Sequence, residues 1–130
     1  MKNVSITLYG IPNCDTVKKS RAWMTEHGLD YQFHDFKKQG VPADRASEWT
    51  QILGWQKVLN RQGTTWRKLN ADTQAAVQDD ASARAVMQNH PSTIKRPIVE
   101  WHVSGQTEPT TTVGFAPEQW QALVETVRAG

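Results

Sequence analysis

The hydrophobic positions of the first 36 residues predict a strand, a helix and a second strand. Residues 4–9 alternate between apolar and polar side chains, as a half-buried strand does. Gly10 and Pro12 interrupt this pattern, and a helical segment follows from about residue 16 to residue 27. Residues 31–36 alternate again and are rich in aromatic side chains. We therefore expect a βαβ unit with two parallel strands and a right-handed crossover.

Between about residue 42 and residue 91 the pattern predicts helices and no strand. Pro42 suits the first position of a helix over residues 43–53, and Gly54 suits its C-terminal cap. A short apolar stretch and a short turn at residues 66–69 come next. Two further helices follow, which we expect to run from about 73 to 78 and from 81 to 89, capped by Asp72 and Asp80.

The last third of the chain returns to strands. Residues 98–103 are β-branched and predict a strand, and residues 110–113 predict a second one that forms a hairpin with it. A final helix opens with Pro117 at its first position. Residues 37–40 are the only linker-like stretch. The expected fold is a single α/β domain over residues 1–130, ordered β-α-β, helical insertion, β-β-α.

Composition narrows the functional classes. With 15 Lys and Arg against 13 Asp and Glu, the 130-residue chain has a net charge of +2, which argues against a dedicated nucleic-acid surface. It has no apolar run of about 18 residues, so no membrane span is expected. The single cysteine cannot form an internal disulfide and suits a reducing compartment, which predicts a cytoplasmic protein. The four histidines are scattered and none pairs with the cysteine at metal-ligand spacing, so no metal is expected.

Cys14 is the candidate for chemistry. It lies in the stretch 9–19, where the first strand gives way to the first helix. The N–H groups and the dipole at a helix start favour thiolate over thiol, and Lys18 and Lys19 add positive charge. A free cysteine is often only a small buried hydrophobe, but the polar turn around this one favours a reactive thiol. Because position 17 is Val17, there is no C-x-x-C motif, and an outside thiol must resolve any oxidised state.

Four further residues are candidates from the sequence alone. Arg96 and Pro97 precede the third strand, where a cis X-Pro turn would present an extended backbone edge and Arg96 could hold an anion. An exposed loop is the alternative. Arg61, in the helical block, is either a second anion ligand or a solvated surface charge. His34 could act as a base for Cys14, although a half-buried packing role is the preferred interpretation.

Taken together, these features resemble the arsenate reductase/Spx family of thioredoxin-fold proteins over essentially the whole chain. Within that family the chain is most similar to the small glutathione-dependent thiol reductases. The resemblance rests on Gly10-Ile11-Pro12-Asn13-Cys14-Asp15-Thr16-Val17-Lys18-Lys19, Leu59-Asn60-Arg61, Thr65-Trp66-Arg67-Lys68-Leu69 and Arg96-Pro97-Ile98.

The resemblance implies a thioredoxin-like fold with an all-helical subdomain at about residues 42–91. It further implies a reductase in which Cys14 attacks the substrate and glutathione, as a cosubstrate, resolves the product, with no tightly bound cofactor. Arg61 and Arg96 match family arginines that bind an oxyanion. The site predicted for substrate and glutathione consists of Asn13, Lys18, Arg61, Arg96 and Pro97.

Two alternatives follow from the same resemblance. Arsenate reductases use a further arginine after the third strand, whereas this chain has no lysine or arginine between Arg96 and Arg128, which disfavours arsenate as the substrate. Spx-type members are transcription regulators that bind RNA polymerase and switch through a C-x-x-C disulfide. Val17 rules out that internal switch but leaves a polymerase contact open.

Overall fold

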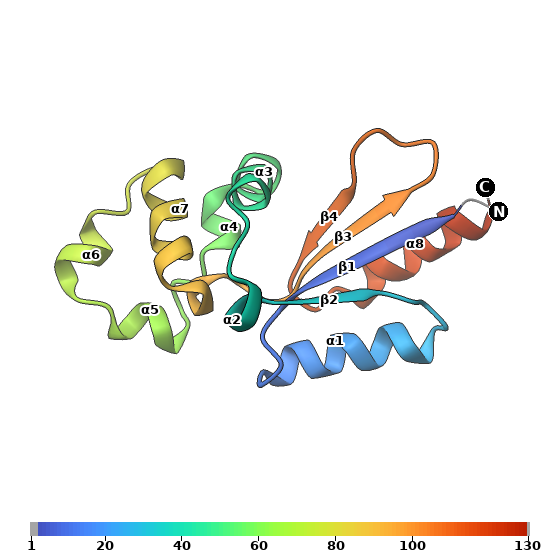
Figure 1. Ribbon diagram of the computed structural model, residues 1–130, viewed down its shortest axis with the longest axis horizontal. Coiled ribbons are helices and arrows are strands. Elements are labelled where there is room, and N and C mark those ends of the chain that lie inside the picture. Colours follow the sequence, from blue (N-terminus) through green and yellow to red (C-terminus); the bar gives the residue numbers. More distant parts are fainter. Residues whose placement is uncertain (1–2, 130) are drawn as a thin grey trace. The chain divides into compact units, whose positions relative to one another are not determined.

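The computed structural model describes residues 3–129, which form two compact units. The sheet unit comprises residues 3–35 and 96–129, and the helical unit comprises residues 36–95. The insertion predicted at about residues 42–91 falls inside the helical unit. Both units are drawn in Figure 1.

A four-stranded sheet organises the sheet unit, with strand order β2-β1-β3-β4 (Figure 1). Strand β1 is parallel to β2 and antiparallel to β3, and β3 is antiparallel to β4. Both the predicted parallel pair and the predicted hairpin are therefore confirmed. The strands are β1 (Val4–Gly10), β2 (Gln32–Asp35), β3 (Ile98–Val103) and β4 (Thr110–Val113).

Two helices cover one face of this sheet, α1 (Asp15–Glu26) and α8 (Pro117–Ala129). Alternate residues of a strand point to the same face, so Ile6 and Leu8 of β1 and the buried Val99 and Trp101 of β3 meet both helices on one side. Pro117 begins α8 as predicted. The shared core consists of Ile6, Leu8, Val17, Met24, Val99, Trp101, Trp120 and Val124.

The helical unit contains short helices, as predicted, and no strand within residues 36–95. Its nearest approach to a sheet is an isolated bridge between Leu59 and Ile94. No helix among residues 3–129 has the length and apolar character needed to cross a membrane. The elements are α2 (Phe36–Gln39), α3 (Ala43–Leu53), α4 (Trp55–Val58), α5 (Thr64–Lys68), α6 (Ala71–Ala75), α7 (Asp80–Asn89) and a 3₁₀ turn, η1 (Pro91–Thr93).

Both predicted aspartate caps are wrong by one or two residues. Helix α6 begins at Ala71 because the Asn70 side chain accepts a hydrogen bond from the Thr73 N–H at 2.7 Å. Helix α7 is capped by Asp79, which forms a capping box with Ser82. In both places the chain offers more than one possible capping residue within a few positions, and the one whose backbone is extended becomes the cap.

Three other local predictions are also corrected. Residues 37–40 are not a linker, since residues 36–39 form α2. Pro42 has extended backbone angles, φ −63° and ψ 128°, so it is the N-cap of α3 rather than its first residue. The turn predicted at residues 66–69 is mostly part of α5. Gly54 does end α3, with a φ of 88° that glycine adopts readily.

Candidate functional site

Cys14 is the N-cap of α1 in the sheet unit. Its backbone is extended, with φ −148° and ψ 123°, and its carbonyl accepts the hydrogen bond from the Lys18 N–H at 2.9 Å. The side chain forms no conventional capping bond. It is partly buried and packs against the core shared by the sheet and the two helices. The thiol therefore lies at the positive end of a twelve-residue helix, as the sequence predicted.

A close approach between β1 and α1 fixes the position of this helix start. Gly10 is the last residue of β1, and a Cβ atom placed on it would lie 2.8 Å from Cγ2 of Val17. Val17 is fully buried in the first turn of α1. Any side chain at position 10 would thus push the first turn of α1 away from the strand. The sequence showed Gly10 only as a break in the pattern, because this contact joins two elements.

The surroundings of Cys14 lower the pKa of its thiol below the ordinary value. Partial burial raises the pKa, but hydrogen bonding from the Val17 N–H, the hydrogen bond and the positive charge of Arg96, and the Thr16 N–H together outweigh it. All of these donors stabilise the charged sulfur. The arrangement accordingly favours a thiolate nucleophile at a helix start.

Arg96 is the predicted site residue that the structure brings to Cys14. Its guanidinium provides both a hydrogen bond and a charge to the sulfur. The following peptide bond, Arg96–Pro97, is cis, and Pro97 is buried. The Pro97 carbonyl accepts a hydrogen bond from the Gly114 N–H at 2.8 Å, which ties this turn to the end of β4. Two segments distant in sequence thus meet at the thiol.

The lysines expected to assist Cys14 do not contribute to its lowered pKa. The side chains of Asn13 and Lys18 are exposed and make no hydrogen bond or ion pair within residues 3–129. The Lys19 ammonium lies 5.0 Å from the centroid of the Phe115 ring. The cationic stabilisation comes from Arg96 instead. A role for Asn13 and Lys18 toward a bound substrate stays a prediction.

Arg61 belongs to the helical unit, just after α4. Its guanidinium lies over the Trp55 ring, 5.4 Å from the ring centroid, and the side chain is exposed. The backbone before it is anchored, because the Asn60 N–H donates to the Thr93 carbonyl at 2.7 Å. An exposed arginine on a fixed loop suits an anion ligand, and its action on the substrate of Cys14 stays a prediction.

Two further kinds of residue bear on the chemistry, His34 and the possible metal ligands. The His34 ring packs against Tyr9, with ring centroids 4.9 Å apart, in agreement with a packing role. No group of three histidine, cysteine or acidic side chains that could hold a metal ion occurs in residues 3–129.

Known proteins are similar to this chain in sequence and in fold. The family model described as ArsC matches residues 9–123. An uncharacterised protein of Haemophilus influenzae is 32% identical over 117 residues, covering 90% of this chain and 96% of its own. The global transcriptional regulator Spx of Staphylococcus saprophyticus is 25% identical over 96 residues, covering 72% of each chain.

Solved structures agree with this relationship. The structure of a protein named YffB has a TM-score of 0.80 and 43% identity, covering 90% of this chain and 96% of its own. An arsenate reductase (ArsC) related protein from Brucella melitensis has a TM-score of 0.66 and 45% identity, covering 93% and 95%. These neighbours confirm the predicted thioredoxin-like fold.

Proposed function

Because this chain belongs to the ArsC family, we propose that it is a thiol reductase with Cys14 as its single nucleophile and glutathione as its external reductant. The observation that carries the proposal is the lowered pKa of Cys14, to which Arg96 and the first N–H groups of α1 contribute. A redox role suits the family, which includes proteins named arsenate reductases. The glutathione step is our inference from the solitary thiol.

The chemistry requires only one protein sulfur. In the first step the Cys14 thiolate attacks the glutathione sulfur of a substrate–glutathione disulfide. A Cys14–glutathione disulfide forms and the substrate leaves as a thiolate. In the second step the thiolate of another glutathione attacks the glutathione sulfur of that disulfide. Oxidised glutathione is released and the Cys14 thiolate is regenerated. The proton of the incoming glutathione ends on the substrate thiol. One reduced glutathione is consumed per turnover, and the substrate–glutathione disulfide and glutathione become the substrate thiol and oxidised glutathione.

The charged side chains suit an anionic partner. Glutathione carries two carboxylates, and a planar guanidinium binds a carboxylate through two parallel hydrogen bonds. We assign this role to Arg96, with Asn13 and Lys18 as further ligands in the same unit. Arg61 of the helical unit is proposed as a separate anion ligand. We further assign to the segment at Pro97 the backbone edge along which the peptide of glutathione lies. The proposal requires a reducing compartment such as the cytoplasm, where reduced glutathione is supplied.

The test is adduct formation followed by release. The protein is treated with oxidised glutathione, and intact mass and peptide mapping locate the mixed disulfide, which we expect at Cys14. Reduced glutathione should then remove it and restore the thiol. The alkylation rate of Cys14 with iodoacetamide, measured against pH, should show an inflection below about 8.5, the ordinary value for a free thiol. The proposal would be overturned if the alkylation rate had its inflection at the ordinary thiol value and no glutathione adduct formed. The Cys14→Ser variant, which has no thiol, is the control for both measurements.

Two alternatives are separated by parallel assays. The first alternative is arsenate reduction, which the 45% sequence identity to an arsenate reductase (ArsC) related protein suggests. It is tested by an assay of arsenate reduction with glutathione as the electron source. We expect no turnover there, because residues 107–112 supply no additional cation next to the sheet. The resemblance to Spx favours a pull-down with RNA polymerase. Capture that persists in Cys14→Ser, without any glutathione adduct in the natural protein, would favour a non-enzymatic regulator.

A further inference from the structure

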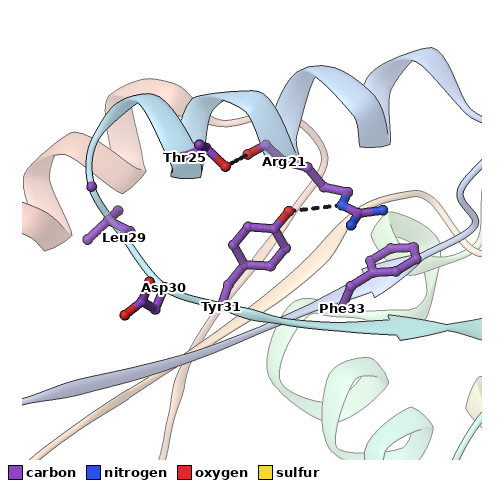
Figure 2. A pocket seen from close by; sticks show the side chains of 7 residues that line it. Arg21, Thr25, Leu29, Asp30, Tyr31 and Phe33 are labelled. Carbon is purple, nitrogen blue, oxygen red and sulfur yellow. Dashed lines mark hydrogen bonds between the residues drawn. The ribbon is translucent and has the colours of Figure 1, made fainter.

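A pocket of about 510 Å³ lies in the sheet unit between the second half of α1 and the segment that leads into β2 (Figure 2). Its volume is within the range of small-molecule sites. Strand β2 is an edge strand of the sheet, so the pocket lies at the β2 edge. The residues that line it are Arg21, Thr25, Gly28, Leu29, Asp30, Tyr31 and Phe33.

Arg21 is held in a fixed orientation at one end of the pocket. Its Nε donates a hydrogen bond to the Tyr31 hydroxyl at 2.9 Å. The guanidinium carbon lies 4.2 Å from the centroid of the Phe33 ring and 5.8 Å from that of Tyr31. Figure 2 shows the guanidinium between the Tyr31 hydroxyl and the Phe33 ring. A partly buried cation fixed by two rings and one hydrogen bond has lost most of its side-chain freedom before any ligand arrives.

The Arg21 end of the pocket has hydrogen-bond donors that no protein group uses within residues 3–129. Only Nε of Arg21 is used within residues 3–129, so the two terminal amino groups of the guanidinium have no hydrogen-bond acceptor there. The Tyr31 hydroxyl accepts from Nε and retains its own proton for a further acceptor. Two kinds of donor, one of them charged, thus border the same apolar wall. That combination matches a carboxylate, which accepts several hydrogen bonds and is bound most strongly by arginine.

The rest of the pocket is lined differently. Leu29, Tyr31 and Phe33 provide apolar surface, and Asp30 lies at the opposite end, with its carboxylate directed away from Arg21 in Figure 2. The negative charge is therefore separated from the cation. We propose that this pocket binds a small carboxylate that carries an apolar body, with the carboxylate at Arg21 and Tyr31 and the body against Leu29 and Phe33. Binding in this pocket does not depend on the reductase chemistry at Cys14.

The probe is 3-phenylpropionate, with 3-phenylpropanol as its neutral counterpart and propionate as the counterpart without a ring. Binding is followed by amide chemical-shift changes in the Cys14→Ser protein, which removes thiol chemistry from the experiment. We expect saturable shifts at residues 21–33 with phenylpropionate and at least about tenfold weaker binding of the other two compounds. Equal binding of the alcohol, or shifts elsewhere only, would overturn the proposal.

Variants then test the role of Arg21. Arg21→Gln should weaken phenylpropionate binding by about tenfold or more, and Arg21→Lys should restore only part of it, because lysine lacks the planar fork. Lys68→Gln removes one exposed positive charge from the helical unit and should leave the affinity unchanged. Should Arg21→Gln lower thermal stability, Phe33→Leu provides a second variant that keeps the cation and removes the aromatic ring. No saturable binding to the natural pocket would mean that Arg21 only joins α1 to β2.

Discussion

The helix that carries Cys14 and the helix that follows Asp79 begin in different ways. The Asp79 carboxylate accepts a hydrogen bond from the Ser82 N–H at 2.9 Å, and the Ser82 hydroxyl oxygen accepts one from the Asp79 N–H at 3.1 Å, which completes a capping box. Cys14 occupies the same position of α1 without a conventional capping bond. Both helix starts nevertheless favour a negative charge, since the pKa of the Asp79 carboxyl and that of the Cys14 thiol are both lowered.

The two capping residues differ in the pH range over which they carry a negative charge. The pKa of Asp79 is lowered first by the Ser82 N–H and hydroxyl, so the carboxylate caps α7 throughout the neutral range. A thiol is a weak acceptor until it ionises, so the N–H groups of α1 are used fully only when Cys14 is a thiolate. Helix α1 is stabilised instead by burial of Val17 and Met24 in the sheet core. We infer that Cys14 caps α1 less strongly than Asp79 caps α7, and that the cysteine in return provides a thiol that can ionise reversibly.

The largest effect is expected where β1 approaches α1. Gly10→Ala would place a Cβ atom 2.8 Å from Val17, so we expect a loss of about 1–3 kcal/mol in the free energy of unfolding. The same substitution should raise the pKa of Cys14, because the Val17 N–H moves away from the sulfur. Urea denaturation and pH-dependent alkylation measure the two effects.

Gly63→Ala is the matched control for that substitution in the helical unit. A Cβ at Gly63 would lie 3.0 Å from the Asn60 side-chain nitrogen, a group that can rotate aside. We expect a loss below about 0.5 kcal/mol, as for ordinary surface substitutions. Equal losses in the two variants would show that the approach of β1 to α1 does not position the helix start.

Removal of the Arg96 cation should come next in size. Arg96→Gln keeps a hydrogen-bond donor but removes the charge that stabilises the thiolate, so the pKa of Cys14 should rise. The alkylation rate at pH 6 should fall by on the order of tenfold, as expected for loss of a charge-assisted hydrogen bond. Arg84→Gln, on α7 and in an ion pair with Asp80, controls for net charge and should leave the rate unchanged. If the alkylation rate of Arg96→Gln were unchanged, the lowered pKa of Cys14 would be due to the start of α1 alone.

The third expected effect concerns the helices that do have a cap. Asn70→Ala removes the acceptor for the Thr73 N–H and should lower the free energy of unfolding by about 1 kcal/mol. Hydrogen exchange should show the loss of protection at residues 71–75. Asn70→Asp, which keeps the acceptor, should restore it. If Asn70→Ala left the free energy of unfolding and the hydrogen-exchange protection unchanged, these short helices would not depend on their caps.

The sequence predicted the sheet unit better than the helical unit, for a physical reason. Strand and helix positions in the sheet unit follow from apolar periodicity, which a core of large side chains imposes over many residues. The short helices of residues 55–75 offer too few periods, and their starts depend on which of several polar residues has an extended backbone. Asn70 rather than Asp72 illustrates this, and the longer helix α7, which is capped by Asp79 rather than Asp80, shows the same dependence on backbone conformation.

The same division holds for the candidate site. Cys14 and Arg96 could be selected by chemistry and motif, since a lone thiol at a helix start and an arginine before a proline are visible in the sequence. The N–H groups of the helix start were predicted from the same position. The contribution of Gly10 depends on a contact between two elements and could not be predicted. The expectation that Lys18 assists Cys14 rested on proximity along the chain. Proximity of that kind does not fix where a long, exposed side chain points.

A smaller effect is expected from the capping position of α1 itself. Serine is a strong N-cap residue, so Cys14→Ser should stabilise α1 while it removes the nucleophile. We expect a gain of about 0.5 kcal/mol at pH 5.5, measured by urea denaturation. Cys14→Ala, which supplies no acceptor, should not show this gain. A loss of stability in Cys14→Ser would mean that packing of the sulfur on the core outweighs the cap.

The smallest effect is a change of that gain with pH. Because the pKa of Cys14 is lower in the folded chain than in the unfolded one, thiolate formation stabilises the native protein. This contribution is fully present above the unfolded value of about 8.5 and is lost as the pH falls through the folded pKa. The advantage of Cys14→Ser over the natural protein should therefore be greatest at pH 5.5 and should shrink toward pH 9. Unfolding curves at four pH values measure it, with Cys14→Ala as the reference that has no ionisable group at position 14. A constant difference across this range would show that the start of α1 does not discriminate between thiol and thiolate, and the contrast with Asp79 would then reflect cap strength alone.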